Sequence, residues 1–306
     1  MDGSMTSYDA LLLLSFGGPE GPDDVIPFLE NVTRGRNIPR ERLEEVGEHY
    51  YMFGGVSPIN QLCRDLKAAI EADFADHGVG LPVYWGNRNW DPYLADTVRQ
   101  MKADGIRRAA AFVTSAYSGY STNDQYLDDI ARVRAEVEGA PEIDKLPVYC
   151  DRPEFVEPFV DATKDALSGL PEGARVVFTA HSVPLSQPNQ EKYVAELEAV
   201  AREVARKAAP GAPWDLVYQS RSGPPSQPWL EPQITDHLSD LHGKGVRAVA
   251  VVPIGFVSDH MEVKYDLDVE AADLAAELGI AFARAGTPGT DPRFATLPRR
   301  LLADAG

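Results

Sequence analysis

Short apolar runs alternate along the chain with longer segments whose apolar residues recur every three or four positions. The run Leu11-Leu12-Leu13-Leu14 has no polar alternation, which is typical of a strand buried on both faces of a parallel sheet. Gly17-Gly18-Pro19 breaks this run soon afterwards. On the same criteria, strands are predicted over 10–16, 81–85, 107–113, 146–149, 175–179, 215–219, 246–252 and 280–285. Helices are predicted over 23–31, 60–76, 91–104, 123–137, 152–167, 190–208, 228–244, 259–278 and 291–303.

Strands that alternate with helices predict parallel sheets with right-handed crossovers, and therefore an α/β fold. The 306 residues are enough for two domains of ordinary size. We expect the first domain over 1–145 and the second over 146–306, although no linker or low-complexity tract marks the joint. The sequence leaves open whether the closing helix over 291–303 packs back on the first domain.

The composition is that of a globular protein, with 44% hydrophobic and 25% charged residues. The formal net charge of -18 argues against binding to nucleic acid or to anionic lipid, because both need a basic surface. No run of 18 apolar residues is present, so no transmembrane helix is predicted. The two cysteines, Cys63 and Cys150, form no CxxC and no zinc pattern, which indicates a reduced, cytoplasmic protein with two small buried thiols.

An anionic ligand could bind so acidic a chain only through a local basic patch. Arg34, Arg36, Arg40 and Arg42 lie close together in the sequence and are candidates for such a patch. A solvated loop followed by the start of a helix explains the same residues equally well. The sequence alone does not decide between the two interpretations.

Two predicted strands end abruptly at polar residues that can bind a metal or move a proton. One runs through Val177 and Phe178 to His181, and the other runs through Val252 towards Glu262. Ligand sites in open α/β sheets form just beyond the carboxyl ends of strands, so we expect the imidazole and the carboxylate at one shared site. One nitrogen and one oxygen suit a borderline divalent metal such as Fe²⁺. A permanent structural site usually has four protein ligands, so two ligands indicate a metal that is passed on.

Structural roles remain open for each of these residues. A histidine at position 181 can cap a helix or bond a carbonyl, and Asp259 with Glu262 fits a variant capping box. Glu262, Asp266 and Glu270 are spaced by four and would share one helix face. Such a line of acids is either a route for protons or a hydrated cation, or a solvated helix face.

Several segments resemble the motifs of ferrochelatases, in the same order and over nearly the whole chain. They are Ser15-Phe16-Gly17-Gly18-Pro19, Asn31-Val32-Thr33-Arg34-Gly35-Arg36, Phe53-Gly54-Gly55-Val56-Ser57-Pro58, Thr179-Ala180-His181-Ser182-Val183-Pro184, Gln219-Ser220-Arg221-Ser222-Gly223-Pro224-Pro225 with Pro228-Trp229-Leu230, and Pro253-Ile254-Gly255-Phe256-Val257-Ser258-Asp259-His260-Met261-Glu262 with Asp266. The resemblance is strongest to the Gram-positive branch, particularly to actinobacterial members that resemble coproporphyrin III ferrochelatases. It implies two Rossmann-like, chelatase-type domains that enclose a porphyrin cleft. It also implies insertion of Fe²⁺ into coproporphyrin III to give Fe-coproporphyrin III (coproheme) during haem biosynthesis.

The resemblance further implies roles for individual residues. His181 and Glu262 match the catalytic histidine and glutamate of the iron site. Asp266 and Glu270 match the acidic line behind that site, which would relay protons or metal. The residues that match the porphyrin-binding positions are Ser57, Tyr126, Arg34, Arg36 and Phe16.

The chain departs from some relatives at three places. Phe16 stands where they have a tyrosine, so axial ligation of the metal by this residue is ruled out. Thr33 stands where some carry an additional arginine, which puts one contact to a porphyrin carboxylate in question. No cysteine follows Cys150, so the [2Fe–2S] cluster that some relatives hold on mostly C-terminal cysteines is not expected.

We therefore expect Fe²⁺ as a substrate and a tetrapyrrole as the binding partner of a cytoplasmic monomer, with a transient partner from the haem pathway. Three other functions stay open: a ferrochelatase for protoporphyrin IX, a cobalt or nickel chelatase for sirohydrochlorin, and a non-catalytic carrier of haem or porphyrin. The pairing of a histidine with a glutamate disfavours the sirohydrochlorin chelatases, which are usually shorter or use two histidines. The sequence does not tell whether His181 accepts a pyrrole proton or binds the metal, with Glu262 in the other role.

Overall fold

The computed structural model describes residues 7–224 and 226–305. The chain divides into two compact units. The first consists of the described residues of Met1–Thr114, Gln125–Pro147 and Ala295–Gly306, and the second of those of Ser115–Asp124 and Val148–Phe294. Residues 1–6 and 306, which the expected domains include, and Pro225 of the fifth motif lie outside the described residues.

A four-stranded parallel sheet with the order β2-β1-β3-β4 forms the centre of the first unit. Its strands are β1 (Ala10–Ser15), β2 (Val83–Asn87), β3 (Arg108–Val113) and β4 (Glu142–Lys145). β1 lies between β2 and β3, with Leu12 opposite Tyr84 and Ala111, and each of its six residues is fully buried. This position explains the uninterrupted apolar run, because a central strand of a parallel sheet has helices on both faces.

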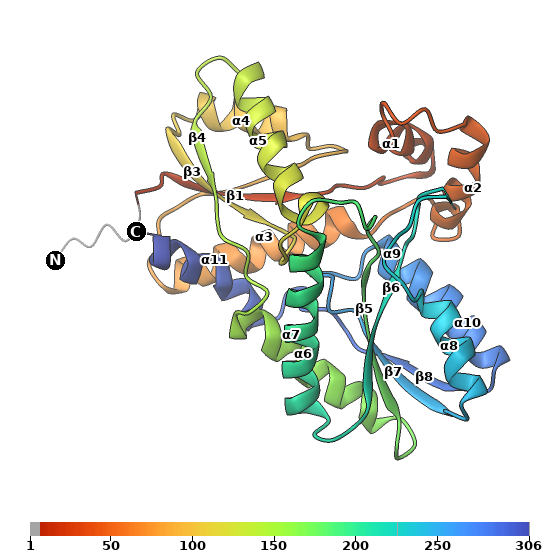
Figure 1. Cartoon of the computed structure of the whole chain (residues 1–306). Helices are drawn as coiled ribbons and strands as arrows, with labels where there is room; N and C mark the ends of the chain where they lie inside the picture. Colours follow the sequence, from red (N-terminus) through yellow and green to blue (C-terminus); the bar gives the residue numbers. More distant parts are fainter. Residues whose placement is uncertain (1–6, 225, 306) are drawn as a thin grey trace. The chain divides into compact units, whose positions relative to one another are not determined.

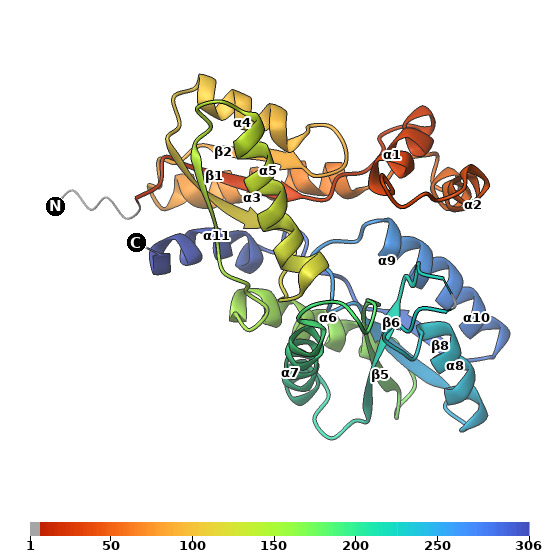
Figure 2. The same cartoon turned by 45° about the horizontal axis from the view of Figure 1, so that its top comes forward.

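The helical segments of the first unit are η1 (Pro22–Asp24, a 3₁₀ turn), α1 (Val25–Val32), α2 (Arg40–Tyr51), α3 (Ile59–Asp76), α4 (Leu94–Ala103), α5 (Gln125–Glu136) and, from Ala295 onward, α11 (Pro292–Ala305). α4 and α5 pack on the face of the sheet that carries Leu12 and Ala111. α3 and α11 lie on the opposite side of the sheet (Figure 2), where Arg299 of α11 and Asp73 of α3 form an ion pair at 2.7 Å. The sheet is therefore covered on both faces.

A second four-stranded parallel sheet, with the order β6-β5-β7-β8, forms the centre of the other unit. Its strands are β5 (Arg175–His181), β6 (Trp214–Gln219), β7 (Ala248–Val252) and β8 (Ala281–Arg284). The helical segments are η2 (Tyr120–Asp124, π-helical), α6 (Pro153–Ser168), α7 (Gln190–Ala208), α8 (Ile234–Gly243), α9 (Met261–Tyr265), η3 (Asp266–Ala271, π-helical) and α10 (Ala272–Glu277). Figure 1 shows α6 and α7 on one face and α8 and α10 on the other. The latter face buries Val177 and Val251 against Leu238 of α8 and Leu267 of η3.

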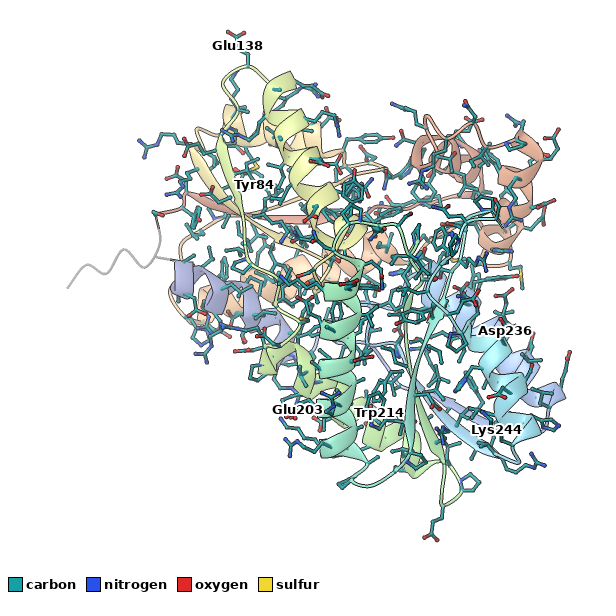
Figure 3. The ribbon with its side chains drawn as sticks, viewed as in Figure 1. Tyr84, Glu138, Glu203, Trp214, Asp236 and Lys244 are labelled. Atoms are coloured by element: carbon teal, nitrogen blue, oxygen red, sulfur yellow. The ribbon has the colours of Figure 1, made fainter. Side chains whose placement is uncertain are left out.

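Structural contacts fill the amino edge of the second sheet. Trp214, labelled in Figure 3, begins β6 and packs edge-on against Phe178, with the ring centres 5.8 Å apart. The next residue, Asp215, pairs with Arg175 at the start of β5 and with His237 of α8. The carboxyl edge is therefore the edge that remains for a ligand, as in other open α/β sheets.

The predicted α/β class with parallel sheets is confirmed, and four elements differ from the prediction. The predicted strand over 146–149 is wrong, because the strand is β4, which pairs with β3 at the edge of the first sheet. β4 is polar, so it lacks the apolar run by which central strands are found. The helix α2 was not predicted. The predicted helix over 228–244 begins only at Ile234, since Pro232 lacks the N–H that a helix needs.

The segment predicted as one regular helix over 259–278 is the fourth element that differs. It consists of α9, the π-helix η3 and α10 in direct succession. A π-helix is rare, and π-helical turns inside α-helices are frequently found at functional sites. Within the described residues, no helix combines the length and the apolar composition needed to cross a membrane.

Candidate active site

The carboxyl edge of the second sheet brings the ends of β5 and β7 together. These two strands are neighbours and run in the same direction. The loop after β7 crosses the end of β5, where the amide of Gly255 donates a hydrogen bond of 3.1 Å to the carbonyl of Thr179. A Cβ atom on Gly255 would lie 2.6 Å from the Cβ of Ala180, so only glycine permits this crossing. The loop then leads into α9, which carries Glu262.

His181 and Glu262, the predicted metal ligands, lie side by side at this edge. Nε2 of His181 is 3.2 Å from Oε1 of Glu262, and both side chains are partly exposed. Nδ1 of the same ring donates a hydrogen bond to the carbonyl of Ser182. A carbonyl can only accept, so Nδ1 carries a proton and Nε2 is the nitrogen that faces the carboxylate. In the neutral ring, Nε2 can therefore bind a metal or accept a proton.

The two groups change each other's protonation. Burial lowers the pKa of His181, but the charge of Glu262 and the hydrogen bond to it more than offset this, and the pKa is raised to about 9. Burial raises the pKa of Glu262, but the charge of His181 and its hydrogen bond outweigh this and lower the pKa to about 2. At neutral pH the pair is an imidazolium beside a carboxylate, so a metal must displace the proton on Nε2. A metal ion about 2.1 Å from both Nε2 and Oε1 would have an N–metal–O angle of about 100°, which suits two neighbouring coordination positions.

Asp266 lies one turn further along the chain and is held by polar side chains. Its carboxylate accepts hydrogen bonds from the hydroxyl of Ser220 and from Nε2 of Gln219, the latter at 3.3 Å. The same Nε2 donates to the main-chain carbonyl of Glu262 at 2.9 Å. Burial raises the pKa of Asp266 to about 7, and the charges of Glu262 and Glu270 act in the same direction. This carboxyl group can therefore gain and lose a proton near neutral pH.

The three predicted carboxylates differ in exposure. Glu262 and Asp266 are half-buried, and Glu270 is exposed. A solvated helix face, the alternative that the sequence left open, describes Glu270 but not Asp266, which is bonded within the protein. Asp266 is therefore held by side chains of the protein, whereas Glu270 faces solvent.

The capping box that the sequence left open for Asp259 and Glu262 is not formed. The N-cap of α9 is His260, whose Nδ1 accepts a hydrogen bond of 3.3 Å from the amide of Glu262. Asp259 instead accepts hydrogen bonds from Arg284 and Thr287. Glu262 reaches His181 with its side chain, so it cannot also close a capping box.

The predicted porphyrin-binding residues all lie in the first unit and differ in exposure. Arg34 and Arg36, in the turn after α1, are exposed, and Phe16, directly after β1, is 36% exposed. Ser57 and Tyr126 are buried, with only 5% and 4% of their surface exposed. Tyr126 is part of the apolar cluster between the sheet and α5, so its ring contributes to the core of the unit. The other two arginines of the candidate basic patch form ion pairs of 2.7–3.3 Å with glutamates of α1 and α2.

Arg88, which the sequence analysis did not single out, contacts two of these residues. Its guanidinium lies 5.9 Å from the ring centre of Phe16 and 4.7 Å from that of Tyr126. Its side chain is 8% exposed and is paired with Asp129. Both contacts are of the cation–π type, so Arg88 orients the aromatic rings beside it. Its position directly after β2 was the available signal, since strand ends are where ligand contacts gather.

Four further residues, to which the sequence analysis gave no role in the site, bond the segments that carry His181 and Glu262. They are Tyr117, Tyr193, Gln219 and Arg284, and each bonds a main-chain or side-chain atom near the pair. From the sequence alone, a tyrosine, a glutamine or an arginine at such positions is assigned to the core or to the surface, because its hydrogen-bonding partner is distant in the chain. Within the described residues, no group of three or more His, Cys, Asp or Glu side chains is arranged to hold a metal ion.

Comparison with solved structures finds chelatases. The sirohydrochlorin chelatase SirB from Bacillus subtilis subspecies spizizenii, in complex with cobalt, superimposes with a TM-score of 0.56, 14% identity, and coverage of 96% of this chain and 95% of that one. CbiX, described as the terminal enzyme for biosynthesis of siroheme in denitrifying bacteria, superimposes with a TM-score of 0.53 and 12% identity. The match covers 97% of this chain and 99% of that one. At this level of identity the likeness shows the fold, which is the two-domain chelatase type.

Comparison of sequences is more specific. The ferrochelatase family profile matches residues 8–304. The coproporphyrin III ferrochelatase of Mycolicibacterium smegmatis is 60% identical over 304 residues, which cover 97% of this chain and 89% of that protein. The enzyme of the same name from Nocardia farcinica is 55% identical over 327 residues, which cover 98% of this chain and 92% of that protein. The chain belongs to the ferrochelatase family.

Proposed function

We propose that this protein inserts Fe²⁺ into coproporphyrin III to give Fe-coproporphyrin III, as a cytoplasmic step of haem biosynthesis. The observation that carries the proposal is the contact of 3.2 Å between Nε2 of His181 and Oε1 of Glu262 at the carboxyl edge of the second sheet. Support for the substrate comes from relatives that are 55–60% identical and are named coproporphyrin III ferrochelatases.

Insertion exchanges two pyrrole N–H protons for one Fe²⁺, so the site must both deliver a metal and remove protons. His181 and Glu262 supply one nitrogen and one oxygen as ligands. Two protein ligands can bind an ion transiently, whereas a permanent site usually has four. Glu262 is deprotonated at neutral pH, and His181 becomes a base once it has released the proton on Nε2. One of them then takes the pyrrole proton while the other directs the ion, and either assignment fits a contact of 3.2 Å.

Protons leave the site through Asp266 and Glu270. Asp266 supports this role because its pKa, raised by burial to about 7, lets it accept and release a proton at neutral pH. Its hydrogen bond from Gln219 connects it to the main chain of Glu262. Glu270 is exposed and passes the proton to water.

The first unit binds the carboxylates of the tetrapyrrole. Arg34 and Arg36 are exposed in a chain whose net charge is -18. They therefore provide local positive charge for the carboxylates, which the rest of the acidic surface would repel. Ser57 and Tyr126 join them as predicted contacts, and Phe16 offers an exposed ring for stacking on the macrocycle.

Fe²⁺ is a substrate in this proposal, and no [2Fe–2S] cluster is involved. The two thiols, Cys63 and Cys150, are buried and free. Burial raises the pKa of Cys63 to about 11 and that of Cys150 to about 12, so neither is a thiolate at neutral pH. A monomer that meets a transient partner of the haem pathway remains our expectation.

Anaerobic incubation of the purified protein with Fe²⁺ and, in parallel, coproporphyrin III, protoporphyrin IX or sirohydrochlorin tests the proposal by visible spectra. The spectrum of Fe-coproporphyrin III is expected to grow fastest, and His181→Ala should abolish it while porphyrin still binds. His237→Ala is the matched control, because its ring also contacts a carboxylate, 3.0 Å from Asp215, at the other edge of the same sheet. Faster turnover of another tetrapyrrole would reassign the substrate, and binding without any metal-dependent change would indicate a carrier.

A further inference from the structure

The segment that carries Glu262 is a short α-helix that continues as a π-helix. α9 has five residues, and its N-cap bond from the amide of Glu262 to Nδ1 of His260 is long, at 3.3 Å. It continues directly into η3, whose π-helical turns are wider than those of an α-helix. Contacts from other elements therefore add to the backbone bonds in fixing the position of Glu262.

Arg284, the last residue of β8, makes such contacts on both sides of Glu262. Its Nε is 2.6 Å from Oδ1 of Asp268, and its Nη2 is 3.0 Å from Oδ2, which gives a fork of two bonds. Its Nη1 is 2.9 Å from Oδ2 of Asp259. One guanidinium thus joins a residue three positions before Glu262 to a residue six positions after it. We call Arg284, Asp259 and Asp268 the Arg284 clamp.

The surroundings of the Arg284 clamp favour a strong interaction. The side chain of Arg284 is only 14% exposed, and those of Asp259 and Asp268 are 29% and 32% exposed. Exposed single ion pairs contribute little, whereas forked pairs within a network are the ones that hold a geometry. The hydroxyl of Thr287 donates to the remaining oxygen of Asp259 at 2.8 Å, which fixes that carboxylate further.

We propose that Arg284 is a positioning residue for metal insertion, because it keeps the carboxylate of Glu262 within reach of Nε2 of His181. The inference rests on the proposed function, which gives this pair its task. Arg284 contacts neither the metal nor the tetrapyrrole in this role. When the Arg284 clamp opens, α9 and η3 relax, and an incoming ion meets one donor instead of two.

Arg284→Lys tests the role while keeping the charge, because a single ammonium cannot reproduce the fork to Asp268 and the bond to Asp259 together. We expect kcat for anaerobic Fe²⁺ insertion to fall about 10- to 100-fold, the usual effect of removing a residue that orients a metal ligand. The KM for coproporphyrin III should stay within about twofold, since substrate binding is not touched. Arg175→Lys is the matched control, because Arg175 forms the same kind of fork with Asp215 at the opposite edge of this sheet.

Hydrogen exchange gives a readout that does not depend on turnover. Amides of residues 261–271 are expected to exchange about tenfold faster in Arg284→Lys and to be unchanged in Arg175→Lys. Asp268→Asn opens the Arg284 clamp from the other side and should give the same fall in kcat and the same faster exchange. It therefore tests the positioning role even if Arg284→Lys does not fold. The double variant should lose no more kcat than Arg284→Lys alone, because both substitutions break the same fork between Arg284 and Asp268.

The outcomes separate the two proposals. If the wild-type protein inserts no iron, the proposed function fails, while the exchange data still show whether Arg284 holds the segment. Unchanged kcat in a folded Arg284→Lys variant, or an equal loss of kcat in Arg175→Lys, would overturn the positioning role.

Discussion

The phenol of Tyr193 donates a hydrogen bond of 3.0 Å to the main-chain carbonyl of His181. Tyr193 lies on α7, is 1% exposed, and packs edge-on against Tyr117, with the ring centres 6.0 Å apart. Tyr117 makes the equivalent bond, of 2.8 Å, to the carbonyl of Ile254 in the loop after β7. Two buried phenols therefore hold the two main-chain segments that deliver His181 and Glu262.

Tyr193→Phe is expected to weaken both the fold and the site, because it removes the donor that fixes the carbonyl of His181. The free energy of unfolding should fall by about 1–2 kcal/mol, the effect of losing a buried hydrogen bond. The rate of Fe²⁺ insertion should fall about tenfold, since a small displacement of His181 lengthens its contact with Glu262. Urea unfolding and anaerobic insertion assays measure the two effects.

Tyr84→Phe is the control for Tyr193→Phe. Its phenol bonds to Asp104 at the surface of the first unit, at 2.7 Å, so its loss should change stability by less than about 0.5 kcal/mol and leave insertion unchanged. Wild-type insertion by Tyr193→Phe would show that the carbonyl of His181 needs no such support.

Gly255→Ala should separate the two strand ends. The added methyl group would lie 2.6 Å from the Cβ of Ala180 and 2.7 Å from its Cα, so the loop or the end of β5 must move. We expect a loss of stability of about 1–3 kcal/mol, as for other overpacked sites, and near-complete loss of insertion. Thermal unfolding with the insertion assay measures both.

Gly243→Ala at the end of α8 is the control for Gly255→Ala, because no heavy atom lies within 4 Å of its Cβ position. This variant should be as stable as the wild type or slightly more stable, with full activity. An active, stable Gly255→Ala protein would mean that the crossing tolerates a wider separation than the contact distances indicate.

Most of the fold could be predicted because central parallel strands are buried on both faces. The strand over 10–16 was visible as an apolar run, and the helix predicted over 190–208 has the bounds of α7. The strand β4 could not be found in this way, since it is a polar strand at the edge. α2 did have a signal, because Leu43, Val46 and Tyr50 are spaced as on one helix face and pack against α1, but charged residues surround them.

The site could be predicted only in part. His181 ends β5 and Glu262 lies in the segment after β7, and parallel neighbouring strands end at the same edge of a sheet, so the meeting of the two residues follows from the chain direction. The supporting residues could not be predicted, because the sequence does not reveal the carbonyl that Tyr193 bonds or the carboxylates that Arg284 joins. The π-helix η3 likewise has no local pattern that distinguishes it from the helix expected there.

The stability of the second unit should depend on pH through Asp215. Burial raises the pKa of this carboxyl group, but the hydrogen bonds from Arg175 and His237 outweigh burial and hold the pKa well below its usual 3.8. A lowered pKa in the folded state stabilises the protein above the unfolded-state value, and this contribution is lost as pH falls towards the folded-state value. Asp215→Asn should therefore destabilise by about 2 kcal/mol at pH 7, and by less below pH 4. Urea unfolding at pH 7, 5 and 3.5 measures the difference, and a difference that stays constant to pH 3.5 would contradict it.

The proposed proton route through Asp266 predicts how turnover depends on pH. Its raised pKa of about 7 means that it is a carboxylate, and thus a proton acceptor, above that pH, and is increasingly protonated below it. The rate of insertion should therefore rise as the pH increases from 6 to 8. Asp266→Asn removes the acceptor, so we expect turnover to be about 10- to 100-fold slower and the inflection near pH 7 to disappear.

The two ionisations of the site can be separated in the same assay. The pKa of His181, raised to about 9 mainly by Glu262 against the effect of burial, should still give an inflection in Asp266→Asn. Glu270→Gln is the matched control, because Glu270 is exposed and water can replace it, so only a small reduction is expected. An inflection near pH 7 that persists in Asp266→Asn would assign it to another group, and protons would then leave the site without passing through η3.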